Sequence, residues 1–154
     1  MNPKESKILY VDDEVHNLNA FKASFRRDYE VFTAISAAEG RKILEENEIH
    51  VIITDQRMPE ATGIEFLESI LEKYPDPPRI LLTGYADISA VIDAINKGSV
   101  FKYVQKPWDE EELRTTINSA LEMYLLNKQK EELTEKLILT NEQMEFLLRQ
   151  NLLS

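Results

Sequence analysis

The sequence predicts an α/β protein whose parallel sheet is covered by helices on both faces. Five short apolar runs alternate with amphipathic segments of helical period between residues 8 and 104 of the 154-residue chain. Runs of four or five apolar residues are too short for helices and are typical of strands buried on both faces. Five strand-then-helix units of this spacing indicate a doubly wound parallel sheet.

The expected elements follow one another in chain order. The strands are residues 8–11, 31–34, 51–54, 80–83 and 100–104. The helices between them carry apolar stripes at Leu18, Phe21 and Phe25; at Ala37, Ile43 and Leu44; at Ile64, Phe66, Leu67, Ile70 and Leu71; and at Ile88, Val91, Ile92 and Ile95. Ser36 is expected to cap the second helix, with Glu39 at capping-box spacing. Asp87 can cap the fourth helix, and Gly98 can end it.

A fifth helix is expected to begin near Asp109, because three glutamates in its first turn suit the helix dipole. Its sheet-facing residues are Leu113, Ile117, Ala120, Leu121 and Tyr124. Neither glycine nor proline occurs after Pro107, so nothing in the composition of this region ends the helix. The chain is therefore expected to divide into a domain of residues 1–122 and a helical extension of residues 123–154.

A seven-residue apolar pattern continues through the extension. One core position holds Met123, Lys130, Leu137, Met144 and Asn151, and the other holds Leu126, Leu133, Thr140, Leu147 and Ser154. Six of these ten residues are apolar, which is typical of a coiled coil with polar interruptions. A lone helix this polar is marginally stable. We expect a parallel homodimer through this helix; a partner helix, contact with the first domain and partial disorder are the alternatives.

The composition excludes several classes of function. Cysteine is absent, so disulfides, cysteine metal sites and thiol nucleophiles are ruled out. A formal charge of −10 without a local basic patch argues against nucleic-acid binding. No run of about 18 apolar residues that could span a membrane occurs, and the first residues have no signal-peptide core. We expect a soluble, cytoplasmic protein.

The polar residues at the ends of four expected strands indicate phosphoryl chemistry. Asp12 and Asp13 follow the first strand, Asp55 ends the third, Thr83 ends the fourth and Lys106 follows the fifth. Ligands of open α/β sheets bind beyond these carboxyl ends. Three carboxylates without histidine or cysteine favour Mg²⁺. Mg²⁺, a lysine and a carboxylate nucleophile together suit transfer of a phosphoryl group to aspartate.

These residues, in this order, resemble the receiver domain of two-component response regulators. The matching motifs are Asp12-Asp13, Asp55 followed by Gln56-Arg57-Met58-Pro59, Gly63, Thr83-Gly84 and Lys106-Pro107. The resemblance covers residues 6–122. It implies a flavodoxin-like fold, with a five-stranded parallel sheet of order 2-1-3-4-5, and a cis peptide bond between Lys106 and Pro107.

The resemblance also implies roles for the acidic residues. Asp55 corresponds to the phosphoacceptor, and a histidine kinase or phosphotransfer protein would be the donor. Asp13 would bind Mg²⁺ directly and Asp12 largely through water. The backbone carbonyl of Arg57 would be a further ligand.

The switch residues follow in the same way. Lys106 would pair with the phosphate, and the Thr83 hydroxyl would close onto it. Tyr103 matches the aromatic position whose ring then turns inward. The fourth helix, fifth strand and fifth helix would change shape, and a partner or downstream domain would read that change.

Two other classes of function remain as alternatives. One is a scaffold or dimerisation module that keeps the fold without switching, and Mg²⁺ binding would distinguish it. The other is a hydrolase with an aspartyl intermediate, which turnover of an aryl phosphate would reveal. We expect a phosphoacceptor rather than an enzyme.

Several neighbouring residues carry weaker expectations. Arg57 and Tyr85 are large neighbours that can hinder attacking water, which favours a long-lived phosphoryl group. The strings around them resemble those of regulators that carry signalling enzymes. His16 and His50 are expected at the surface, and Trp108 is expected to pack against its neighbours.

Overall fold

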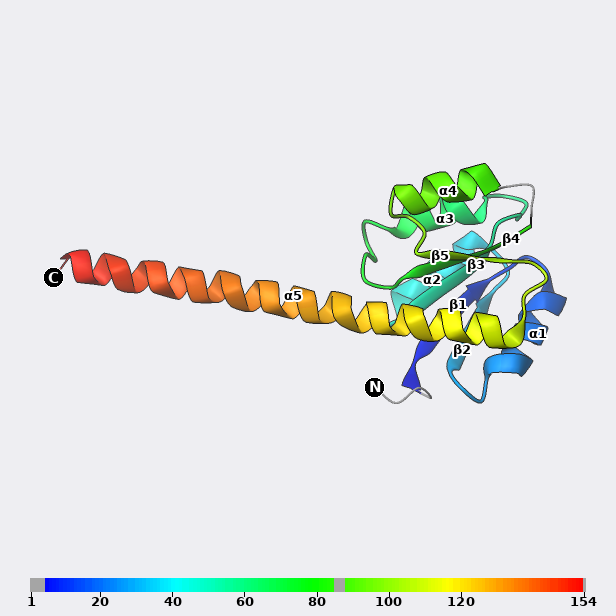
Figure 1. Cartoon of the computed structure of the whole chain (residues 1–154), viewed down its shortest axis with the longest axis horizontal. Helices are drawn as coiled ribbons and strands as arrows, with labels where there is room; N and C mark the ends of the chain where they lie inside the picture. The colour runs from blue at the N-terminus through cyan, green and yellow to red at the C-terminus, as the bar shows by residue number, and fades with distance from the viewer. Residues whose placement is uncertain (1–4, 85–87, 154) are drawn as a thin grey trace. The chain divides into compact units, whose positions relative to one another are not determined.

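The computed structural model describes residues 5–84 and 88–153, and it confirms the expected doubly wound sheet (Figure 1). Within these ranges the strands are β1 (Lys7–Val11), β2 (Glu30–Ala34), β3 (Val51–Asp55), β4 (Arg79–Thr83) and β5 (Lys102–Gln105). All neighbouring pairs are parallel, in the order β2-β1-β3-β4-β5. Their carboxyl ends therefore share one edge of the sheet.

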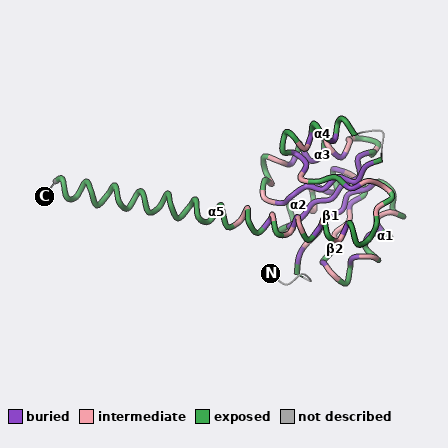
Figure 2. Tube along the Cα trace, in the orientation of Figure 1, coloured by how far each residue is buried: buried purple, intermediate pink, exposed green. Residues whose placement is uncertain are grey.

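Helices cover both faces of this sheet. They are α1 (Val15–Phe25), α2 (Ala37–Glu46), α3 (Gly63–Ile70), α4 (Ile88–Asn96) and α5 (Glu110–Leu153). Buried residues of α1 and of the first part of α5 pack on one face, and those of α2, α3 and α4 pack on the other. The strand side chains alternate between these two clusters, so most strand residues are buried (Figure 2).

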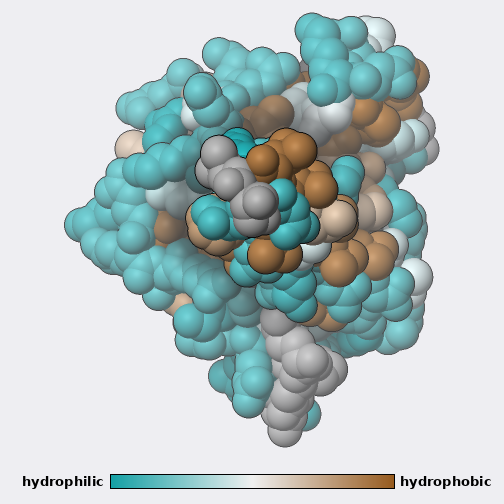
Figure 3. Space-filling view, turned by 90° about the vertical axis from the view of Figure 1, so that its left-hand side faces the viewer, coloured by the Kyte–Doolittle hydropathy of each residue, from teal (hydrophilic) through white to brown (hydrophobic). Residues whose placement is uncertain are grey.

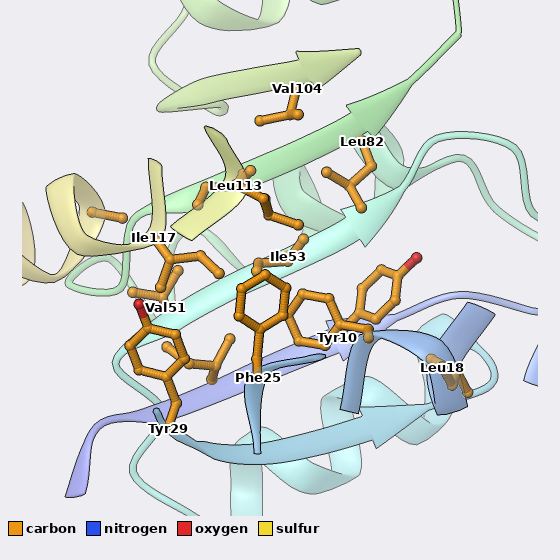
Figure 4. Close-up of a cluster of buried hydrophobic side chains, with 14 residues drawn as sticks. Tyr10, Leu18, Phe25, Tyr29, Val51, Ile53, Leu82, Val104, Leu113 and Ile117 are labelled. Carbon is orange, nitrogen blue, oxygen red and sulfur yellow. The ribbon is translucent and has the colours of Figure 1, made fainter. Parts of the chain in front are cut away.

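The cluster beneath α1 and α5 contains a chain of aromatic rings (Figure 4). The rings of Tyr10 and Phe21 have centroids 4.6 Å apart, and those of Phe21 and Phe25 are 4.8 Å apart. Trp108 contacts both phenylalanines, with centroids 6.3 Å and 5.8 Å away. Through Trp108, this hydrophobic cluster reaches a residue only two positions after Lys106.

The helix ends follow local capping chemistry. The Ser36 hydroxyl accepts a hydrogen bond from the backbone of Glu39, as expected. Thr62 and Glu65 form a complete capping box at the start of α3; their spacing in the sequence matches this motif, although it was not among the expected caps. Gly98 follows α4 with φ of +80°, a left-handed conformation that favours glycine. Asp87, the expected cap of α4, lies outside the described residues.

Two expected elements differ in detail from the structure. Strand β5 begins at Lys102 rather than residue 100, because the backbone of Val100 still donates a hydrogen bond to Ala94 in α4. In α4 only Val91 and Ala94 are buried. Ile88 and Ile92, which belong to the expected stripe, are 42% and 51% exposed. The apolar stripe of α4 is wider than the surface that the helix covers.

The prediction that His50 lies at the surface is wrong. His50 is 8% exposed, and its Nδ1 accepts a hydrogen bond of 2.9 Å from the backbone nitrogen of Lys7. Its ring lies 4.9 Å from that of Tyr124 in α5, whose hydroxyl donates to Glu48 at 3.0 Å. A partner on another element, invisible in a local pattern, explains this burial.

The chain divides into two compact units, Met1–Tyr124 and Leu125–Ser154. The second unit is helical through Leu153, and its apolar side chains are largely exposed (Figure 2). Figure 3 faces the carboxyl end of the chain and shows hydrophobic side chains on its surface beside hydrophilic ones. None of the helices in the described ranges combines the length and apolarity needed to cross a lipid bilayer.

Candidate functional site

Three carboxylates meet at the carboxyl edge of the sheet. Asp12 and Asp13 follow β1, and Asp55 is the last residue of β3. One carboxylate oxygen from each lies within 4.8 Å of the others. Asp12 is fully buried and Asp55 is 7% exposed, whereas Asp13 is exposed. The parallel register places β1 beside β3, so residues distant in sequence converge as expected.

Hydrogen bonds hold the Asp12 side chain from three directions. The Tyr10 hydroxyl donates to Oδ2 at 2.6 Å, and the Asn17 amide donates to the same oxygen at 3.1 Å. The backbone nitrogen of Glu14 donates to Oδ1 at 3.0 Å. Burial and the neighbouring Asp12 carboxylate raise the pKa of Tyr10 far above its usual value, so its phenol remains a donor. The sequence pattern gave no indication of these roles for Tyr10 and Asn17.

Lys106 is the cation of the site. Its Nζ forms an ion pair with Oδ1 of Asp55, and its backbone nitrogen donates to the Thr83 carbonyl at 2.9 Å. The expected cis peptide bond joins it to Pro107. Burial raises the pKa of Asp55; Lys106 opposes this effect, and the charges of Asp12 and Asp13 add to it. An unneutralised cluster of carboxylates therefore remains beside one lysine.

The predicted switch residues are on β4 and β5, Thr83 at the end of β4 and Tyr103 opposite Leu81. Thr83 is 2% exposed, and its hydroxyl donates to the Gly84 carbonyl at 3.2 Å. Tyr103 is 38% exposed. Arg57 has an exposed side chain in the segment after β3, two residues from Asp55. Tyr85 lies outside the described residues.

Gly63 lets α3 begin directly against the end of β3. A Cβ at this position would lie 2.4 Å from the backbone oxygen of Asp55 and 2.8 Å from Leu81. The Gly63 nitrogen donates to Gln56, whose side chain in turn accepts from the nitrogen of Ile64. The start of α3 and the end of β3 are thus locked together.

We expect Gly63→Ala to lower the free energy of unfolding by about 2 kcal/mol, because the added methyl overlaps backbone that cannot move freely. Urea denaturation measures this change. Gly84→Ala is the matched control, since a Cβ at Gly84 meets nothing within 4 Å. Equal effects of the two substitutions would contradict this account of Gly63.

The donor set fits a hard divalent cation. All three side chains offer carboxylate oxygen, which is the ligand that Mg²⁺ prefers. The Asp12 side chain accepts hydrogen bonds from three donors, and Asp13 is open to solvent. An additional positive charge would relieve the repulsion that raises the pKa of Asp55.

Comparison with known proteins establishes the family. The family model described as "response regulator receiver domain" matches residues 8–118 of this chain. The chain belongs to the response regulator receiver domain family. The receiver fold of a response regulator receiver domain protein from Clostridium thermocellum superimposes with a TM-score of 0.75 at 38% identity, covering 79% of this chain and 98% of that one.

Two further proteins are similar to this chain. The hydrogenase transcriptional regulatory protein HoxA of Bradyrhizobium diazoefficiens is 36% identical over 127 residues, which are 82% of this chain and 26% of HoxA. A structure described as adenylate cyclase from Rhodopirellula baltica gives a TM-score of 0.83 at 32% identity, covering 86% of this chain and 98% of that chain. The receiver chain thus spans about a quarter of the length of its curated relative HoxA.

Proposed function

We propose that this receiver domain accepts a phosphoryl group on Asp55 from the phosphohistidine of a histidine kinase or phosphotransfer protein, with Mg²⁺ bound by Asp12, Asp13, Asp55 and the Arg57 carbonyl. The observation that carries the proposal is the buried Asp55, paired with Lys106 and facing two further carboxylates. An ion pair between Asp55 and Lys106 with only a structural role would not need two further carboxylates beside it. The repulsion among the three carboxylates favours a bound cation.

The proposed transfer assigns a task to each side chain. A carboxylate oxygen of Asp55 attacks phosphorus, the bond between phosphorus and the donor imidazole nitrogen breaks, and that nitrogen keeps the electron pair. Bound Mg²⁺ supplies positive charge to the phosphoryl oxygens. Lys106 moves from its pair with Asp55 to the incoming phosphate, where a point charge stabilises the transferring group. The buried carboxylate of Asp12 stays in place because its donors hold it.

The switch follows from the charge added at Asp55. A phosphoryl group adds about −1.5 to −2 charges at neutral pH. The Thr83 hydroxyl, which donates to Gly84 in this structure, would donate to the phosphoryl group, and Tyr103 would turn inward from its exposed position. Ile92 and Tyr103 expose apolar surface on α4 and β5, and we propose that a partner or downstream domain reads this face.

Phosphorylation by a small phosphoramidate tests the proposal, because this donor carries the same phosphorus–nitrogen bond as phosphohistidine. We expect a mass increase of one phosphoryl group that requires Mg²⁺ and is removed by hydroxylamine, as an acyl phosphate should be. A modification that hydroxylamine leaves in place would contradict aspartyl chemistry. Turnover of an aryl phosphate would instead favour the hydrolase alternative.

We further propose that Leu125–Ser154 forms a parallel homodimer. Leu126, Leu133, Leu137 and Met144 are 57%, 60%, 64% and 57% exposed, and they recur at intervals of seven and four residues. Helices with such a stripe gain stability by pairing. The described part of this helix carries four positive and five negative side chains, so self-association meets little net repulsion.

We expect Leu133→Glu combined with Leu137→Glu to convert the dimer into a monomer, since two charges would enter the paired stripe. Light scattering measures the mass. Arg149→Glu is the control, because it changes the charge by the same two units away from the stripe. Repeating the measurement with beryllofluoride and Mg²⁺ shows whether phosphorylation changes the assembly. A monomeric wild-type chain would contradict the coiled-coil interpretation.

The net charge of the chain bears on whether its proposed effector is a protein or a nucleic acid. HoxA is a transcriptional regulator, whereas the Rhodopirellula structure is described as an adenylate cyclase. The acidic chain, with its formal charge of −10, favours a signalling-enzyme or protein partner over direct contact with nucleic acid. Because the chain belongs to the receiver domain family, we also propose a cytoplasmic signalling role.

A further inference from the structure

The environment of Asp12 is built from neutral donors. This carboxylate is 0% exposed, and the described residues that hydrogen-bond to it are Tyr10, Asn17 and the backbone of Glu14. Burial of an ionised carboxylate costs free energy unless hydrogen bonds replace water. Three donors meet that need, and the Tyr10 bond of 2.6 Å is as short as those of charge-assisted hydroxyl donors.

The donors are unequally divided between the two oxygens. Oδ2 accepts from Tyr10 and Asn17, whereas Oδ1 accepts from the Glu14 backbone. Rotation of the carboxylate would break all three bonds. The orientation of Asp12 is therefore fixed, and Oδ1 retains more acceptor capacity for a cation or for water bound to a cation.

The position of the Tyr10 hydroxyl is set by the hydrophobic core. Tyr10 is 1% exposed, and its ring packs against Phe21 with centroids 4.6 Å apart. Figure 4 shows the ring among the buried side chains, with its oxygen toward the carboxyl ends of the strands. Because the ring is packed in the core, the Tyr10 hydroxyl is held in position beside Asp12.

We infer that Tyr10, assisted by Asn17, is a positioning residue that preorganises Asp12 for a divalent cation. This inference rests on the Mg²⁺ site of the proposed function. Ligand carboxylates that are themselves hydrogen-bonded bind metals more tightly, and loss of such an outer partner typically weakens affinity by about 10–100-fold. Tyr10 touches neither the phosphoryl donor nor Asp55 in this account, and it acts through Asp12.

Trp108 provides a direct readout of binding. It is the only tryptophan in the chain, and together with Tyr10, Asn17 and Lys106 it lines an open hollow of about 430 Å³ beside the acidic cluster. Its fluorescence should respond when Mg²⁺ enters the cluster. Isothermal titration calorimetry of the full chain with MgCl₂ gives the same dissociation constant without relying on the fluorophore.

The test compares Tyr10→Phe with Tyr29→Phe. Tyr29 is a suitable control, because it is 3% exposed in the same cluster and its hydroxyl donates to Asn118 at the same 2.6 Å. We expect Tyr10→Phe to weaken Mg²⁺ binding about tenfold and Tyr29→Phe to leave it unchanged. Both variants should lose stability without Mg²⁺, since each loses one tyrosine hydrogen bond, which is buried for Tyr10 and partly buried for Tyr29.

The outcomes separate this inference from the proposed function. Wild-type affinity in Tyr10→Phe, or an equal loss in both variants, would overturn the positioning role while the Mg²⁺ site stands. Failure of the wild-type chain to bind Mg²⁺ would overturn the proposed function itself. Asn17→Ala, which leaves the core intact, provides the second test if Tyr10→Phe does not fold; it should weaken binding severalfold, and unchanged affinity would contradict the inference.

Discussion

Asp55→Asn is expected to abolish phosphoryl transfer to this chain. An amide oxygen is a poor nucleophile, and the remaining acids of the cluster do not share the ion pair with Lys106 that places Asp55 beside the proposed phosphate position. Intact-mass measurement after incubation with phosphoramidate and Mg²⁺ should show no added phosphoryl group. Asp93→Asn removes an exposed carboxylate on α4 and should be phosphorylated like the wild type. Phosphorylation of the Asp55→Asn variant at the normal rate would place the acceptor elsewhere.

The same substitution is expected to stabilise the protein in the absence of Mg²⁺. Burial raises the pKa of Asp55 above its value in the unfolded chain, so its ionised form lowers stability at neutral pH. That penalty disappears as the pH falls below the unfolded value of about 4. Urea denaturation with EDTA should therefore favour Asp55→Asn near neutral pH, with a difference that shrinks on acidification. Lower stability of this variant at neutral pH would contradict the described electrostatics.

Lys106→Met is expected to slow phosphorylation by about a hundredfold, because the transferring group loses its preplaced side-chain cation. The methionine keeps most of the side-chain length but removes the charge. Single-turnover phosphorylation by phosphoramidate, followed by intact mass, gives the rate. Mg²⁺ still binds the three carboxylates in this account, so the affinity measured by Trp108 fluorescence should survive.

Lys102→Met is the matched control for this prediction. Lys102 is the first residue of β5, the strand that Lys106 directly follows, and its Nζ contacts Ser119 at 3.4 Å rather than the acidic cluster. Its loss should leave the phosphorylation rate close to that of the wild type. An equal effect of the two lysines would show that general positive charge, rather than the position of Lys106, assists transfer.

Most of the fold, and the convergence of the acidic residues with Lys106, could be predicted from the sequence. Buried parallel strands appear as continuous apolar runs, and strand ends converge in a doubly wound sheet whatever the helices contain. Asp12, Asp13, Asp55 and Lys106 are therefore neighbours because of their places after strands. Gly63 could be recognised from its motif, but the contact with the Asp55 backbone that requires glycine needed coordinates.

The features that the sequence did not predict depend on contacts between elements distant in the sequence. Others depend on a residue type that serves both as an apolar core residue and as a hydrogen-bond donor. Tyr10 has the pattern of one more apolar member of a strand, and only the structure shows its hydroxyl on Asp12. His50 has no local signal for burial, because Tyr124 comes from a helix more than seventy residues later. Ile88 and Ile92 fit the helical period of α4 but exceed the surface that it covers.

The contact between Tyr124 and His50 bears on how the first part of α5 can move. Helix α5 starts next to Trp108, near the acidic cluster, and Tyr124 ends the first unit against His50, which precedes the opposite end of β3. The fifteen residues from Glu110 to Tyr124 correspond to a rod of roughly 22 Å at 1.5 Å per residue. Leu113, Ile117 and Ala120 are fully buried in the core beneath α5, so this stretch is held along its length as well as at Tyr124. A displacement of α5 imposed near Lys106 would therefore reach Tyr124 as a shift of the whole stretch rather than as a local bend.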